Sequence, residues 1–333
     1  MITRRGDLCH RGLQRPFATL VVGFLMVQIV PSQLEISSAA RVSGEAVEGT
    51  TKRTIPETGA QKERRRALVV PREHGAWGML LVPLTTGAAA GLLAGGRFAP
   101  VLSLTAAVLV LFWLRTPVES WLGAGAVLAQ TPEERRLVRS VILPLATIAA
   151  VSLLGLFWRG QNRELIWLGM MAGVAFAAQI VLKKMGRATR VAAEMAGALT
   201  LTSTAPAAYC AAMGRLDETA WALWLVNWLF AANQIHFVWL RIRGARAAGW
   251  SEKLSMGWSF LAGQMFLVGI LVPVYRLRWL PEMTLIAFAP VCVRGLVWFA
   301  TKPQPIVIRR LGWTEFAHAL VFGVLLITGF IYA

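Results

Sequence analysis

Ionisable and polar residues stand at the ends of long apolar segments, where they are candidates for chemistry. Arg115 and Glu119 are four residues apart, and the pairs Asn233/His236 and Glu315/His318 are three apart. Such spacings place both members on one face of a helix, so Arg115 and Glu119 can form an ion pair across a helix break at Pro117. Polar groups at membrane depth are costly and usually face a bundle interior or a water-filled cavity. We therefore expect a polar cavity at one side of the protein.

Two roles are predicted for the residues around this cavity. Carboxylate, amide and imidazole groups could line a reaction centre, whereas guanidinium and ammonium groups could hold a phosphate-like anion. The candidates for the reaction centre are Glu119, Asn233 and His236. The candidates for substrate binding are Arg72, Glu73, His74, Arg115, Lys184, Arg187, Arg241, Arg243, Glu315 and His318.

Apolar helices must position these side chains. The 333 residues are 56% hydrophobic and only 15% charged, whereas soluble domains average about 25% charged residues. A bilayer-spanning helix needs about 20 mainly apolar residues. Segments of this kind cover residues 76–94, 98–119, 137–157, 164–182, 191–213, 219–240, 255–274, 281–300 and 314–332. The predicted fold is an all-α membrane protein, a polytopic bundle of about nine transmembrane helices.

The distribution of Lys and Arg predicts how this bundle is oriented. If the first helix starts in the cytoplasm, the inner segments hold 20 of these residues, and the outer loops with the C-terminal end hold six. The positive-inside rule then places the amino end inside and the carboxyl end outside a bacterial cytoplasmic (inner) membrane. The net charge of +17 is accounted for by topology and by contact with anionic membrane lipids. We expect no nucleic-acid partner.

The chain is predicted to divide at residue 67. Residues 1–66 form an N-terminal extension whose apolar run, residues 17–30, is too short to span a bilayer. This run is similar to a signal peptide or weak anchor, or the tract is translated from a start codon assigned too early. The polar residues that follow the run are expected to be disordered. Residues 67–333 form the nine-helix transmembrane domain.

Three stretches resemble a known family. PREHGAWGMLLVP (71–83), LRTPVESWLG (114–123) and RRLGWTEFAHALVFGVLL (309–326) look like segments of the YwiC-like bacterial membrane proteins, whose role is not established. The resemblance runs from about Arg64 to the end of the chain.

The layout is also similar to the UbiA superfamily of intramembrane prenyltransferases, whose active site lies at the cytoplasmic ends of helices two and six. This resemblance rests on the basic loop before residue 191 and on ANQIHFVWLRIRGARAAGW (232–250). It implies a transferase acting on an isoprenoid or another anionic amphiphile. Those enzymes hold Mg²⁺ with Asp-rich motifs, but the two aspartates of this chain are Asp7 and Asp217. The usual Mg²⁺ site cannot be assembled from them, so the cofactor stays open.

Two arrangements could replace the Mg²⁺ site. Basic residues could bind the anion without Mg²⁺. Alternatively, Glu and His side chains could hold a transition metal, to which imidazole is suited. No metal site is predicted from residue spacing.

The first functional prediction is a divergent prenyl or lipid transferase, which requires Glu119 and His236 to share a cavity. The alternative is a non-catalytic transport or binding protein for an anionic amphiphile, with a proton-linked or gating role for Glu73, His74, Glu315 and His318. Each residue, taken singly, could also be an ordinary interfacial helix end.

Overall fold

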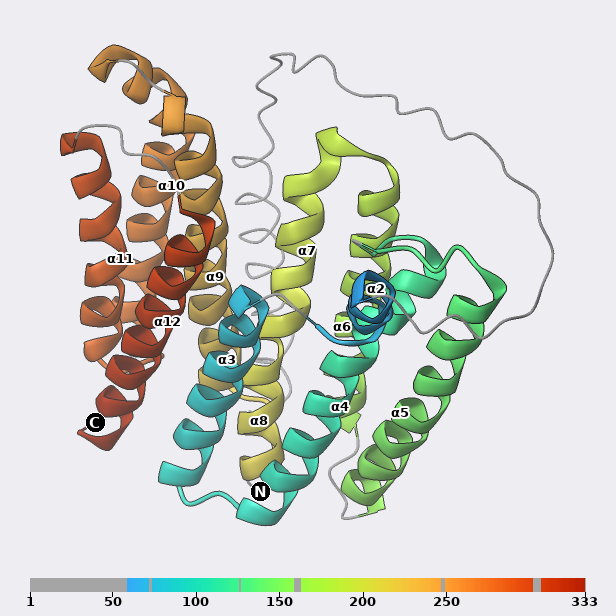
Figure 1. Ribbon diagram of the computed structural model, residues 1–333. Coiled ribbons are helices and arrows are strands. Elements are labelled where there is room, and N and C mark those ends of the chain that lie inside the picture. Colours follow the sequence, from blue (N-terminus) through green and yellow to red (C-terminus); the bar gives the residue numbers. More distant parts are fainter. Residues whose placement is uncertain are drawn as a thin grey trace, which may run out of the picture.

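The protein is a bundle of helices that run side by side and alternate in direction (Figure 1). The computed structural model describes residues 59–71, 74–125, 127–158, 163–246, 249–301 and 307–332, and every regular element within these ranges is helical. Seven helices are long and apolar enough to cross a membrane. They are α3 (His74–Leu93), α4 (Phe98–Leu122), α5 (Pro132–Trp158), α6 (Arg163–Lys184), α10 (Trp250–Arg276), α11 (Met283–Ala300) and α12 (Ile308–Ile331). The prediction of an all-α membrane fold is confirmed; the number of spans and their orientation stay predictions.

The helix predicted over residues 191–213 is broken in the middle. The chain forms α7 (Arg190–Thr202) and α8 (Thr204–Met213), separated at Ser203. Pro206 has no N–H to donate to the Thr202 carbonyl four residues earlier, so the helical ladder is interrupted here. The Ser203 hydroxyl donates to the Thr200 carbonyl at 2.7 Å. The prediction of one continuous helix is therefore wrong at this point.

The helix α9 (Glu218–Arg243) is the centre of the bundle. It packs against α3, α7, α8, α10 and α11. Leu223, Val226, Leu229 and Ala232 are completely buried, which shows that α9 is enclosed on several sides. The polar side chains in the middle of this helix, Asn227, Asn233 and Gln234, are therefore buried inside the protein.

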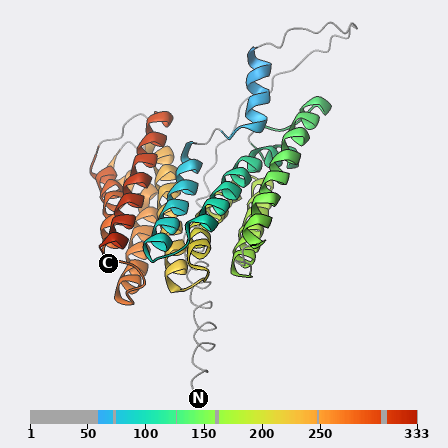
Figure 2. The same cartoon turned by 90° about the horizontal axis from the view of Figure 1, so that it is seen from below.

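The helices at the edges of the bundle expose apolar side chains. Figures 1 and 2 show α5 and α6 at the opposite edge from α10 and α11. Only 11% of the apolar stretch in α5 is buried, compared with 50% of that in α3. Leu143, Val151 and Leu154 on α5 are all more than half exposed. A helix that is apolar on its exposed side is typical of a membrane span, so these edges are lipid-facing surfaces.

The short helix α2 (Gly59–Val69) lies against α4 and α5. Its Leu68 is fully buried, and its Arg64 Nε lies 2.7 Å from Glu134 Oε1. The hydrogen bond to this carboxylate raises the pKa of the Arg64 guanidinium. The helix crosses the predicted boundary at residue 67, while residues 1–58 of the predicted extension lie outside the described residues.

A buried lysine forms hydrogen bonds with carbonyl groups at the end of α11. Lys253 on α10 is 3% exposed, and its Nζ donates to the carbonyls of Trp298, at 3.0 Å, and of Thr301. The same Nζ lies 4.9 Å from the centroid of the Trp298 ring. The last carbonyls of a helix lack their usual helical donors, so Lys253 supplies a charged donor at the end of α11, where the Trp298 carbonyl also accepts from the Thr301 hydroxyl at 3.3 Å.

The Lys253→Met variant is therefore expected to lose about 1–3 kcal/mol of unfolding free energy, because it removes two hydrogen bonds from a charged donor to the end of α11. Thermal unfolding followed by tryptophan fluorescence would measure the loss. Lys62→Met on the exposed face of α2 is the matched control, and it should change stability by less than about 0.5 kcal/mol. Equal effects of the two substitutions would contradict the role given to Lys253.

Candidate functional site

An ion cluster joins α4 to α6 at the end of the bundle that is predicted to face the cytoplasm, called the inner end below. Glu119 is 7% exposed. Its Oε1 lies 2.9 Å from Arg115 Nε, and its Oε2 lies 2.9 Å from Lys183 Nζ. The pair expected from the i,i+4 spacing is thus formed, although α4 continues through Pro117 without the expected break. Two cations share one carboxylate, so the cluster carries a net positive charge.

A second ion pair lies between α11 and α12. The Arg294 Nη1 donates to Glu315 Oε2, and both side chains are nearly buried, at 10% and 8% exposed. Arg294 Nη2 also lies 3.4 Å from Asn233 Oδ1, and the Arg294 guanidinium sits 4.0 Å from the centroid of the Phe237 ring. The carboxamide of Gln234 donates to the Glu315 carbonyl at 2.7 Å. The central helix α9 therefore holds both members of the pair.

This pair lies deeper than the helix ends. At about 1.5 Å per residue, Arg294 is about 9 Å from the end of α11 at Ala300. Glu315 is about 10 Å from the start of α12 at Ile308, by the same rise. Arg294 Nε and Glu315 Oε1 are buried and have no hydrogen-bond partner among the residues that the structure describes. The pair thus has one donor, Arg294 Nε, and one acceptor, Glu315 Oε1, that could bind a ligand.

The two histidines with described side chains occupy separate places. His236 Nε2 lies 3.2 Å from Ser259 Oγ on α10, and its ring packs edge-on against Phe260. His318 Nδ1 donates to the Thr314 carbonyl of its own helix at 2.7 Å. Glu119 contacts Arg115 and Lys183, whereas His236 on α9 contacts Ser259 and Phe260, so the two predicted residues share no partner.

Trp239 contacts three charged side chains at the inner ends of α7 and α9. Its indole Nε1 donates to Glu194 Oε2 at 2.7 Å. The guanidinium groups of Arg190 and Arg243 lie 5.9 Å and 5.3 Å from the centroid of its ring. Arginine stacks on aromatic faces and matches phosphate geometry, so this cluster presents two oriented guanidinium groups near the membrane boundary.

Of the remaining candidate residues, only two have side chains that the structure describes. Lys184 is exposed at the end of α6, and Arg241 is partly buried on α9. Arg72 and Glu73 lie outside the described residues, and the side chains of His74 and Arg187 are likewise outside them. In the described part of the chain, no three His, Cys, Asp or Glu side chains are grouped to hold a metal ion. The transition-metal interpretation therefore has no ligand set there.

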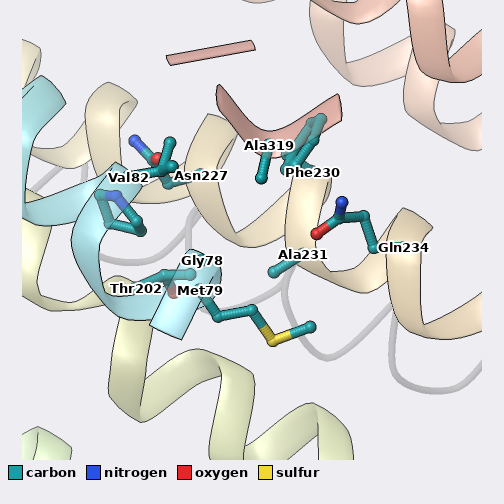
Figure 3. Close-up of a pocket in the computed structure, with 10 residues that line it drawn as sticks. Gly78, Met79, Val82, Thr202, Asn227, Phe230, Ala231, Gln234 and Ala319 are labelled. Atoms are coloured by element: carbon teal, nitrogen blue, oxygen red, sulfur yellow. The ribbon is translucent and has the colours of Figure 1, made fainter. Parts of the chain in front are cut away.

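A small cavity lies between α3, α7, α9 and α12 (Figure 3). Its volume is about 10 Å³, roughly the space that one water molecule requires. It is lined by Gly78, Met79, Val82, Pro83, Thr202, Asn227, Phe230, Ala231, Gln234 and Ala319. Neither Glu119 nor His236 lines it, whereas Gln234 connects it to the Arg294–Glu315 pair through the bond to the Glu315 carbonyl.

Several contributors to these clusters were absent from the candidate site residues, among them Lys183, Gln234 and Arg294. Arg294 had a signal in the sequence, because it is a lone cation within an apolar segment and a buried charge requires a partner. Its partner could not be identified without the arrangement of α11 beside α12. Lys183 adjoins the predicted Lys184, but only the helix geometry shows which of the two ammonium groups turns toward Glu119.

Part of the chain is similar to a known protein family. A family model described as YwiC-like protein matches residues 70–209. This part of the chain, called the YwiC-like region below, is similar to that family. The YwiC-like region runs from α3 to α8 and includes the Arg115–Glu119–Lys183 cluster, but it ends before the helices that carry Arg294 and Glu315. It confirms the resemblance predicted from residues 71–83 and 114–123, while the stretch 309–326 lies beyond it.

No curated protein and no solved structure matches the chain. The resemblance of the bundle to the UbiA superfamily therefore stays a prediction.

Proposed function

We propose that this integral membrane protein is a transport or binding protein for an anionic amphiphile, and that Arg294 and Glu315 form its binding centre. The observation that carries the proposal is the buried ion pair itself. Removing two charges from water costs several kcal/mol per ion, and well-packed apolar residues are often as stable in the same place. Ionisable residues within a membrane bundle commonly mark ion or substrate pathways.

Binding can proceed by exchange at Arg294. An anionic head bears oxygens like those of the Glu315 carboxylate, so it can replace Glu315 on the guanidinium. The displaced carboxylate then lies in an apolar interior without its salt-bridge partner, which favours the protonated form, while the positive charge of Arg241 acts in the opposite direction. Binding of the anion is therefore coupled to proton uptake by Glu315. His318 and Arg241 are the other charged or titratable groups that act on Glu315.

The inner clusters support the choice of an anionic ligand. The Arg115–Glu119–Lys183 cluster has net positive charge, and Arg190 and Arg243 flank Trp239 at the neighbouring helix ends. Positive clusters at a membrane boundary raise the local concentration of anionic ligands. They provide a first contact for the head before it reaches Arg294.

The transferase stays a prediction without support of its own. It places Glu119, Asn233 and His236 in one reaction centre. Each of these residues contacts a different cluster: Glu119 the cations of α4 and α6, Asn233 the guanidinium of Arg294, and His236 the Ser259 hydroxyl. The transport or binding alternative needs no such common centre.

Native mass spectrometry of the purified protein with a bacterial polar lipid extract tests the proposal. The wild type should retain an anionic lipid. Arg294→Gln should lose about tenfold in retention, since it removes a charge-assisted contact. Glu315→Gln should retain more of the same lipid, because Arg294 loses its internal competitor.

The opposite directions of these two effects separate ligand exchange from damage to the fold, which would reduce retention in both variants. Arg276→Gln, an exposed cation at the other end of α10, is the matched control and should bind like the wild type. Unchanged retention in both Arg294→Gln and Glu315→Gln, with folded protein by size-exclusion chromatography, would exclude the pair as the binding centre.

A further inference from the structure

The short helix α2 and the start of α5 form a basic surface, called the α2–α5 surface below. In these two stretches, the exposed carboxylates are Glu63 and Glu133, whereas Glu134 is buried and paired with Arg64. The exposed cations outnumber these carboxylates, so the surface has a net positive charge. These cations are Lys62, Arg65 and Arg66 on α2, and Arg135, Arg136 and Arg139 on α5.

Contacts between α2 and α5 bring the cations of the two helices together. Arg64 Nε lies 2.7 Å from Glu134 Oε1, and Arg65 Nη2 lies 3.7 Å from Glu133 Oε2. Figure 2 shows α2 beside the end of α5. Leu68, on the same face of α2 as Arg64, is fully buried against α5. The cations of α2 therefore lie next to the first turn of α5, in one continuous surface.

One exposed face of α5 changes from basic to apolar along the helix. Arg136 and Arg139 precede Leu143 by seven and four residues, so the three side chains share this face. Leu143 is 68% exposed, and Leu154, further along the same face, is 64% exposed. An anionic phospholipid has the same order, a charged head group followed by an apolar chain. This face therefore suits a lipid that lies along α5 with its head group at the two arginines.

A tryptophan on α4 indicates the depth of α2 in the membrane. Trp113 Nε1 donates to the Val69 carbonyl, at the end of α2, over 3.1 Å. The Trp113 side chain is exposed on the bundle surface, and exposed tryptophans of membrane proteins gather at the membrane–water interface. The helix α2 therefore lies at the level of the lipid head groups, which favours a lipid over an acidic protein as the partner of the α2–α5 surface.

We propose that the α2–α5 surface binds the head group of an anionic phospholipid of the leaflet around the inner end. Each cation near an anionic membrane surface adds to the attraction, and the arginine fork matches phosphate oxygens. A helix of 11 residues is too short to be stable by itself, so the bound lipid stabilises α2 on α5. The inference does not depend on the function proposed for Arg294 and Glu315, because it concerns other residues on other helices.

Hydrogen exchange of the full chain, followed by mass spectrometry in lipid nanodiscs, tests the surface. Nanodiscs of phosphatidylcholine are compared with nanodiscs that also contain phosphatidylglycerol. In the wild type, phosphatidylglycerol should slow exchange of the α2 amides about tenfold, because contact with the head group opposes local opening of the helix. High salt should remove most of this difference by screening. Arg65→Gln/Arg66→Gln should reduce the difference to about twofold or less, since two of the contacts are lost.

Arg309→Gln/Arg310→Gln is the matched control, because it removes two exposed cations at the inner end of α12. It should keep the full effect of phosphatidylglycerol on α2. Loss of the effect in this control would overturn the proposal, since the net charge of the inner end would then be responsible.

Equal exchange of α2 in both kinds of nanodisc would also overturn the proposal and leave an acidic protein as the partner of this surface. If Arg65→Gln/Arg66→Gln loosens α2 in phosphatidylcholine alone, Arg136→Gln/Arg139→Gln decides, because it leaves the sequence of α2 unchanged. This second variant should also lose most of the effect of phosphatidylglycerol, and a full effect would refute the site. None of these results depends on whether Arg294 retains an anionic lipid.

Discussion

Replacing Arg294 with methionine is expected to lower the free energy of unfolding by about 3–5 kcal/mol, because the change leaves a buried carboxylate without its partner. The Glu315 side chain is only 8% exposed, and its carboxylate has no other cation within salt-bridge distance among the described residues. Glu315→Met should be similarly costly, since it leaves the guanidinium unpaired. Reversible unfolding in mixed micelles, followed by tryptophan fluorescence, would measure each loss.

The double variant Arg294→Met/Glu315→Met should recover most of this stability. Apolar replacement of both members of a buried pair is often neutral or stabilising, so the two substitutions should be strongly non-additive. Additive losses would show that the two side chains act independently. A stable double variant that no longer retains the anionic lipid would show that the pair serves binding rather than folding.

Replacing Gly87 with alanine is expected to lower the free energy of unfolding by about 1–3 kcal/mol through overpacking. A Cβ at Gly87 would lie 2.0 Å from the carbonyl oxygen of Ala205, which no rotamer change can relieve because the obstacle is backbone. The helices α3 and α8 must therefore separate. Thermal unfolding in the same detergent would measure the loss.

Gly169→Ala on α6 is the matched control. Its Cβ would meet no atom within 4 Å, and alanine is favoured over glycine within a helix by about 1 kcal/mol. This variant should be as stable as the wild type or slightly more stable. Equal destabilisation at both positions would show that the contact between α3 and α8 is not as close as the structure has it.

The sequence by itself determined the helices and their membrane character. The segment predicted over residues 98–119 became α4, which ends at Leu122, and the segment 137–157 became α5, which begins at Pro132. The first turn of α5 contains Glu133 and Glu134, so apolarity could not locate its start. Helix formation and lipid burial depend on residues close in the chain, and the i,i+4 pair Arg115–Glu119 was predictable for the same reason.

Only the tertiary structure decided which polar groups meet. The spacing of Glu315 and His318 suggested that they act together, but the partner of Glu315 is Arg294 on the neighbouring helix α11. Likewise, Lys183 reaches Glu119 across 64 residues of sequence. Such contacts depend on which helices lie side by side and how each is rotated. Helical periodicity defines the faces of one helix, whereas neighbouring helices and their rotation follow from packing across the whole bundle.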